Sequence, residues 1–124
     1  MTGQGAQFEG NPAPGDPVAV VTFTLSDGQL EENSTLSIDS NLFSKPLTRG
    51  IAVRSEAKLH FVEKGASLTD GLWLVEIEGT ISLRDLTLLP GKKLHVAGGK
   101  VPFECGIDEI KTLGRVVGIY SEVN

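Results

Sequence analysis

The chain has little cysteine and no long apolar run. Cys105 is the single cysteine among 124 residues, so the chain cannot form an internal disulfide. A lone thiol is typical of a reducing compartment, and we interpret Cys105 as a small apolar side chain rather than a reactive nucleophile. No apolar run approaches the ~20 residues of a membrane span, and no signal-peptide pattern precedes the domain. We therefore expect a cytoplasmic protein with no membrane partner.

Basic residues are also scarce. The chain has 11 Lys and Arg against 16 Asp and Glu, which gives a formal charge of -5. Affinity for nucleic acid depends on clustered Lys and Arg side chains that neutralise phosphates. If DNA matters to this protein, another domain is expected to contact it.

Motifs for metal, cofactor or acid/base chemistry are missing. His60 and His95 lie on separate predicted strands, without Cys-x-x-Cys or His-Glu-x-x-His spacing. The glycine pair at 98–99 lacks the Lys-Ser/Thr and helix start of a phosphate loop. Glu76 and Glu78 share a strand face, but an acidic edge facing water or a basic partner is commoner than catalysis. We expect no metal and no cofactor.

Alternating apolar residues are abundant instead, and they favour a β fold. The longest β pattern spans 70–91 and predicts one hairpin. Apolar and polar residues alternate from Trp73 to Ile77, the pair at 79–80 forms the turn, and a second strand returns to Leu89. A hairpin alone is marginal in water, so the Trp73 face must pack on a second layer.

The rest of the chain shows shorter strand signals. Strands are predicted at 18–25 (buried), 35–39, 51–53, 57–62, 93–96 and 112–120, with a short helical turn at 41–43 and irregular segments at 31–33 and 101–110. The two glycines in the last strand indicate a crowded or curved position. No amphipathic helix of ten residues appears, so the fold class is mainly β.

The domain organisation is simple. Residues 1–16 are rich in Gly and Pro and are expected to be a flexible linker or the remnant of a longer chain. Residues 17–124 are enough for one domain with its own core.

Several segments together resemble a repressor family. Leu-Val-Glu-Ile-Glu-Gly at 74–79, Gly-Lys-Lys-Leu-His-Val at 91–96 and Leu-Gly-Arg-Val-Val-Gly at 113–118 follow in the order of LexA-like and lambda-type repressor C-terminal domains. Segments 42–50 and 95–105 further resemble the non-cleaving CI-type repressors of P2-like temperate phages.

This resemblance implies a LexA-like C-terminal fold, with twisted mixed and antiparallel sheets, a long central hairpin and little helix. It implies a domain that joins repressor subunits into dimers and higher oligomers, so that operator binding is cooperative and lysogeny is maintained. The DNA-binding helix-turn-helix domain would precede the linker and is absent from this chain. The resemblance also implies a bacterial cytoplasm and an antirepressor protein as a further partner.

The catalytic dyad of the cleaving relatives is degenerate here. The positions of their Ser nucleophile and Lys base hold Glu63 and Arg84. Glutamate has no activated hydroxyl, and arginine, whose guanidinium stays protonated, is no base at neutral pH. We expect no peptidase activity. One hypothesis is that Glu63 and Arg84 form a charge-assisted pair; the alternative is two separate charges.

Self-association needs exposed apolar surface or unpaired strand edges. The candidate interface residues are Leu42, Phe43, Glu76, Glu78, Val101, Phe103, Val116, Val117, Ile119 and Tyr120. Phe43 and Phe103 equally suit the core. Two other functions stay open: a self-cleaving serine peptidase domain using Ser67, or an unrelated β-type binding module.

Overall fold

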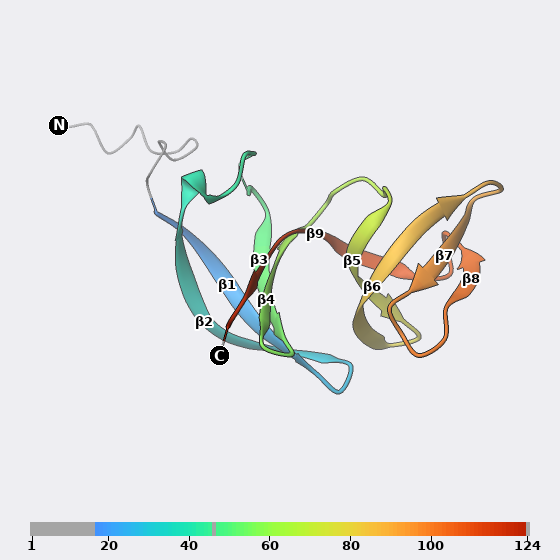
Figure 1. Ribbon diagram of the computed structural model, residues 1–124, viewed down its shortest axis with the longest axis horizontal. Helices are drawn as coiled ribbons and strands as arrows, with labels where there is room; N and C mark the ends of the chain where they lie inside the picture. Colours follow the sequence, from blue (N-terminus) through green and yellow to red (C-terminus); the bar gives the residue numbers. More distant parts are fainter. Residues whose placement is uncertain (1–16, 46, 124) are drawn as a thin grey trace.

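The computed structural model describes residues 17–45 and 47–123, and these are nearly all β-structure (Figure 1). The elements are β1 (Pro17–Ser26), β2 (Gln29–Asp39), the 3-10 turn η2 (Ser40–Leu42), β3 (Gly50–Ser55), β4 (Lys58–Glu63), β5 (Gly71–Ile77), β6 (Thr80–Leu89), β7 (Lys93–Ala97), β8 (Phe103–Gly106) and β9 (Lys111–Ser121). The mainly β prediction is confirmed. The proposed linker at 1–16 lies outside the described residues. Within the described part, no helix is long and apolar enough to cross a membrane.

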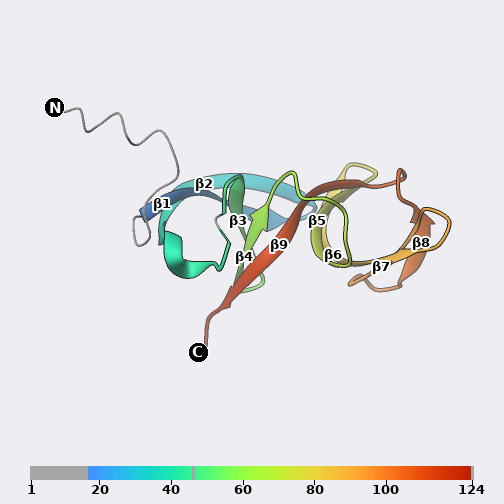
Figure 2. The same ribbon diagram turned by 90° about the horizontal axis from the view of Figure 1, so that it is seen from above.

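One mixed sheet contains all nine strands, in the order β2-β1-β3-β4-β9-β5-β6-β7-β8. Neighbours are antiparallel except for the parallel pair β1 and β3. The long strand β9 joins the two halves of the sheet, because its first part pairs with β5 and its second part with β4. β1–β4 and β5–β8 lie at opposite ends of the long axis, and β5–β8 curl round at their end (Figures 1 and 2).

The central hairpin is confirmed as β5 and β6, with its turn one residue earlier than predicted. Glu78 and Gly79 both have positive φ, 50° and 84°, as in type I′ turns, and Ile77 pairs with Thr80. The β1–β2 turn is of the same kind, with φ of 53° at Asp27 and 76° at Gly28.

The β3–β4 turn was not predicted at its observed place. Ala57 was expected to begin a strand, but Glu56 and Ala57 both have positive φ, 54° and 65°. Neither residue type favours this left-handed conformation, so local sequence does not reveal the turn. Tertiary pairing of β3 with β4 imposes it.

Two segments predicted as irregular are strands. Residues 31–33 belong to β2, where the Asn33 side chain donates to Thr24 Oγ1 on β1. Part of 101–110 forms β8 along β7. Both are edge strands with polar or short patterns, so cross-strand partners rather than local alternation make them strands. The strand predicted at 18–25 is confirmed as β1, although Val20 alone within it is fully buried.

The core consists of three adjoining clusters. Trp73 and Val75 pack inside the curl of β5–β8, with Leu86, Leu94, Val96 and Ile110. Leu74, on the other face of β5, packs with Val53 and Val62 in the middle of the molecule. The third cluster contains Val20, Ala52, Leu59 and Phe61. The prediction that the Trp73 face packs on a second layer is confirmed, and the layer is the curled sheet itself.

The glycines of β9 occupy crowded positions, as predicted. A Cβ at Gly114 would lie 2.9 Å from the backbone oxygen of Glu63 and 2.5 Å from Val62 Cγ1. A Cβ at Gly118 would lie 2.8 Å from Cε1 of Phe43. Gly114 therefore permits the close approach of β9 to β4, and Gly118 makes room for an aromatic ring.

Candidate functional site

An apolar groove lies along the second half of β9. It has a volume of about 560 Å³ and is lined by Leu36, Leu42, Phe43, Arg54, Leu59, Phe61, Val117, Gly118, Ile119 and Tyr120. Ile119 is 50% exposed, Tyr120 56% and Leu42 57%. The fold thus brings five predicted interface residues together, Leu42, Phe43, Val117, Ile119 and Tyr120, although they come from two distant segments.

The groove is built on an aromatic contact. The Phe43 ring meets Phe61 edge-to-face, with ring centroids 5.3 Å apart. The preceding turn η2 is capped by Asp39, whose Oδ1 accepts from the Asn41 backbone N–H at 2.8 Å. Phe43 is half-buried: it packs against the core cluster of Phe61 and also lines the groove, and its place in an interface stays a prediction.

The same part of β9 has an open edge. Within the described residues, β9 pairs with β5 only as far as Arg115, and from Val116 to Ser121 it pairs with β4 alone. Backbone groups on the other side of this stretch are free to pair with another chain.

The remaining predicted interface residues lie elsewhere. Val101 is 71% exposed before β8, and Phe103 is 37% exposed on that edge strand. Glu76 is half-buried on β5, and Glu78 is exposed in the β5–β6 turn. All four belong to the β5–β8 half, so the fold separates them from the apolar groove (Figure 1).

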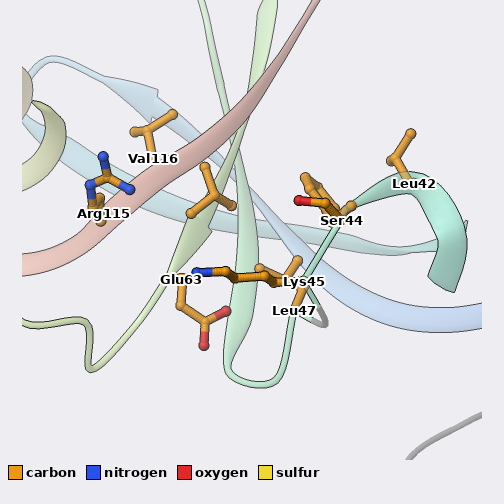
Figure 3. A pocket seen from close by; sticks show the side chains of 9 residues that line it. Leu42, Ser44, Lys45, Leu47, Glu63, Arg115 and Val116 are labelled. Carbon is orange, nitrogen blue, oxygen red and sulfur yellow. The ribbon is translucent and has the colours of Figure 1, made fainter.

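A second hollow, the charged pocket, adjoins the groove. It has a volume of about 690 Å³ and lies between the 42–47 loop and the strands β4 and β9 (Figure 3). Its charged residues are Lys45, Glu63 and Arg115, and its other lining residues are Leu42, Phe43, Ser44, Leu47, Val116 and Val117. The predicted interface residue Val116 is therefore part of this pocket and does not line the groove.

Two charged groups in the pocket are incompletely satisfied. Glu63 Oε2 accepts from Thr48 Oγ1 at 2.9 Å and from the Arg49 backbone N–H at 3.4 Å, but Oε1 is buried without a partner. Arg115 Nε is likewise buried without a partner. Glu63 and Arg115 are paired positions on the neighbouring strands β4 and β9, yet their side chains form no ion pair. Among the described residues, the ion pair within 4.0 Å joins Arg54 to Glu122.

The hypothesis that Glu63 pairs with Arg84 is wrong. Glu63 is on β4 and Arg84 is on β6, and the strands β9 and β5 lie between them, with Arg115 and Trp73 at the intervening positions. Three strand spacings, roughly 14 Å, therefore separate the backbones of Glu63 and Arg84. Arg84 Nε instead donates to Ser82 Oγ at 3.1 Å. Arg115, the neighbour of Glu63 in the sheet, was not predicted as a site residue; its signal in the sequence is a cation within the apolar run of the closing strand.

The histidines and the cysteine show no sign of a metal centre. No group of three potential ligands gathers among residues 17–45 and 47–123. His60 is buried, with Nδ1 3.1 Å from the Val53 carbonyl oxygen. Burial raises the pKa of the Cys105 thiol, and the carboxylates of Glu109 and Asp108 raise it further. The thiol is therefore protonated at neutral pH, in agreement with its interpretation as an apolar side chain.

Comparison with known proteins gives consistent results. The family model for the bacteriophage CI repressor C-terminal domain matches residues 19–118. Over 124 residues the chain is 63% identical to the repressor protein CI of Escherichia phage 186, covering all of this chain and 65% of that protein. It is 39% identical over 51 residues to the repressor protein CI of Haemophilus phage HP1, covering 41% of this chain and 27% of that protein.

A further relative is protein ORFi in retron Ec67 of Escherichia coli, 27% identical over 95 residues, which covers 76% of this chain and 48% of the relative. The chain thus spans less than two thirds of the length of each of these three proteins. The family match covers most of the chain, and two of the three relatives are named as phage repressors. The chain therefore belongs to the bacteriophage CI repressor C-terminal domain family.

Proposed function

We propose that this domain joins copies of a phage repressor into dimers and higher oligomers. The apolar groove is the observation that carries the proposal. A monomer that leaves Leu42, Ile119 and Tyr120 half exposed on one side has a surface suited to a partner. Burying the remaining surface of each contributes about 1 kcal/mol before the entropy of association is subtracted.

The open edge of β9 supports the same interface. A second copy seated on the groove can also pair its backbone with the free groups of Val116–Ser121. Apolar contacts then supply affinity, and backbone hydrogen bonds fix the orientation of the partner.

The candidate interface residues in the β5–β8 half of the sheet suit a second contact between copies of the domain. Val101 and Phe103 present exposed apolar surface, and Glu76 and Glu78 present carboxylates to Lys or Arg of a neighbour. Two separate interfaces on one domain permit assemblies larger than a dimer.

Association makes operator occupancy cooperative. In the full-length repressor, a DNA-binding domain tethered through residues 1–16 would meet adjacent operator sites at high effective concentration once the C-terminal domains associate. This chain's formal charge of -5 agrees with DNA contact through the other domain. An antirepressor protein that disrupts the association would release the operator.

Sedimentation equilibrium over a wide range of concentrations tests the proposal. The wild-type chain is expected to associate, and Ile119→Lys is expected to raise the dissociation constant at least about tenfold, because it places a charge in the groove. Leu88→Lys is the matched control: Leu88 is an apolar residue on β6, 42% exposed and outside the groove. A wild-type chain that stays monomeric at high concentration would contradict the proposal; the alternative of a β-type module unrelated to repressors is already excluded by the family match.

Self-cleavage is not part of the proposed function. Glu63 and Arg84 supply neither nucleophile nor base and do not contact each other. Ser67, the serine of that alternative, is exposed on the loop before β5. Incubation at alkaline pH followed by gel electrophoresis is expected to show an intact chain; fragments would support the peptidase alternative.

A further inference from the structure

We propose that the charged pocket receives Glu122 and Val123 from a second copy of the chain. The inference rests on the proposed self-association and adds a specific reciprocal contact to it. It starts from the two buried polar atoms that lack partners, Glu63 Oε1 and Arg115 Nε. Buried polar atoms are nearly always satisfied in native structures, so each of these two calls for a partner.

The pocket defines the chemistry of that partner. Lys45 and Arg115 carry two positive charges against one negative charge on Glu63, so the lining has a net charge of about +1. Arg115 donates and needs an acceptor, whereas Glu63 Oε1 accepts and needs an N–H. The other walls are largely apolar (Figure 3). The pocket thus suits a peptide segment with a carboxylate beside an apolar side chain.

Glu122 and Val123 have this chemistry. Val123 is 96% exposed, the largest value among the exposed large hydrophobic side chains of the described residues. The Glu122 carboxylate lies 3.9 Å from Arg54 Nη1, with both side chains about half exposed, and such surface pairs contribute little. Residues 122–123, here called the tail, can therefore leave this position at a small cost in free energy.

The pocket cannot be filled by the tail of the same molecule. Glu122 follows Arg115 by seven residues along the extended strand β9, which places them roughly 23 Å apart. β9 also ends on the side away from β5–β8, where Ser121 still pairs with Lys58 of β4 (Figure 2). Only another copy can bring a tail to this pocket.

The position of the pocket favours a copy already bound to the groove. The two hollows share Leu42, Phe43 and Val117, so a partner on the groove lies next to the pocket. There the partner's carboxylate accepts from Arg115 and Lys45, its Val123 backbone N–H donates to Glu63 Oε1, and its valine side chain packs against the apolar walls. Each copy gives its tail and receives one in a two-fold arrangement.

A charge-swap experiment tests this contact by sedimentation equilibrium of the full chain. Glu122→Lys and Arg115→Glu are each expected to raise the dissociation constant about tenfold, as for a partly buried, hydrogen-bonded charge pair. The double variant is expected to recover most of the wild-type affinity. Glu31→Lys is the control: it reverses an exposed carboxylate on β2 that lines neither hollow, and it should leave association unchanged.

A peptide experiment covers the case in which Arg115→Glu does not fold. The peptide Tyr-Ser-Glu-Val-Asn, residues 120–124, is titrated into the chain while NMR follows the Arg115 Nε–H signal. Binding that shifts this signal, and that is lost when the peptide carries Lys in place of Glu, supports the inference. No shift means that the pocket holds only water, and this result would overturn it.

The two proposals fail in different ways. If the wild-type chain associates while the two charge variants act additively, the tail contact is wrong and self-association stands. If the wild-type chain is monomeric, the proposed function is wrong, and the peptide titration alone decides about the pocket.

Discussion

Gly114 is the residue that allows β9 to cross between the two halves of the sheet. It is buried, and the backbone oxygen of Glu63 lies where a Cβ would need room. The neighbour that must yield is backbone, which moves only with its whole strand.

We therefore predict that Gly114→Ala lowers the free energy of unfolding by about 1–3 kcal/mol. Urea denaturation monitored by Trp73 fluorescence measures the change. Gly118→Ala is the comparison, because there the crowding atoms belong to the Phe43 side chain, which can shift. Equal losses for the two variants would contradict the argument.

For single residues, the sequence predicted which apolar side chains are exposed but not which charged side chains are neighbours. The exposure of Leu42, Val117 and Ile119 was predictable, because apolar side chains in a polar loop and in a terminal strand are seldom all buried. Arg115 was not predictable as the neighbour of Glu63. Their pairing depends on β4 and β9, which are distant in the sequence.

Among the hairpins, β3–β4 has the turn residues least suited to their backbone conformation. Its central residues, Glu56 and Ala57, both adopt positive φ, which costs roughly 1 kcal/mol per residue outside glycine and asparagine. The β1–β2 hairpin uses Asp27-Gly28 for the same conformation.

Replacing both residues, Glu56→Asn with Ala57→Gly, is expected to stabilise the domain by about 1–2 kcal/mol. Thermal unfolding in parallel with the wild-type chain checks this. The reverse change in the β1–β2 turn, Gly28→Ala, should destabilise the domain, because Gly28 has φ of 76° and its Cβ would meet Thr80. An unchanged stability in the first variant would mean that the turn is unstrained.

Element prediction succeeded where alternation and turn residues agree. The hairpin of β5 and β6 has a strict two-residue period and a glycine turn, so local rules suffice. β2 and β8 were missed in part because edge strands tolerate polar side chains on both faces. Their structure comes from the strand beside them.

For the whole molecule, self-association links stability to concentration. A partner that binds only the folded state stabilises it by mass action. We predict that the melting temperature of the wild-type chain rises by about 3 °C for each tenfold increase in concentration.

Differential scanning calorimetry at several concentrations measures this dependence. The melting temperature of Ile119→Lys should depend on concentration only above a higher threshold than that of the wild-type chain, while its stability at high dilution stays close to the wild-type value, because Ile119 is half exposed in the monomer. A wild-type melting temperature that does not change with protein concentration would argue against association.

The sequence by itself determined the β class, the principal hairpin and the family motifs, because each depends on a pattern of neighbouring residues. Only the tertiary structure decided that Leu42 and Ile119 share one groove, that Glu63 faces Arg115 instead of Arg84, and that both polar groups remain unsatisfied. The physical reason is that β9 pairs with strands far from it along the chain, and such non-local pairing leaves no local pattern to predict it.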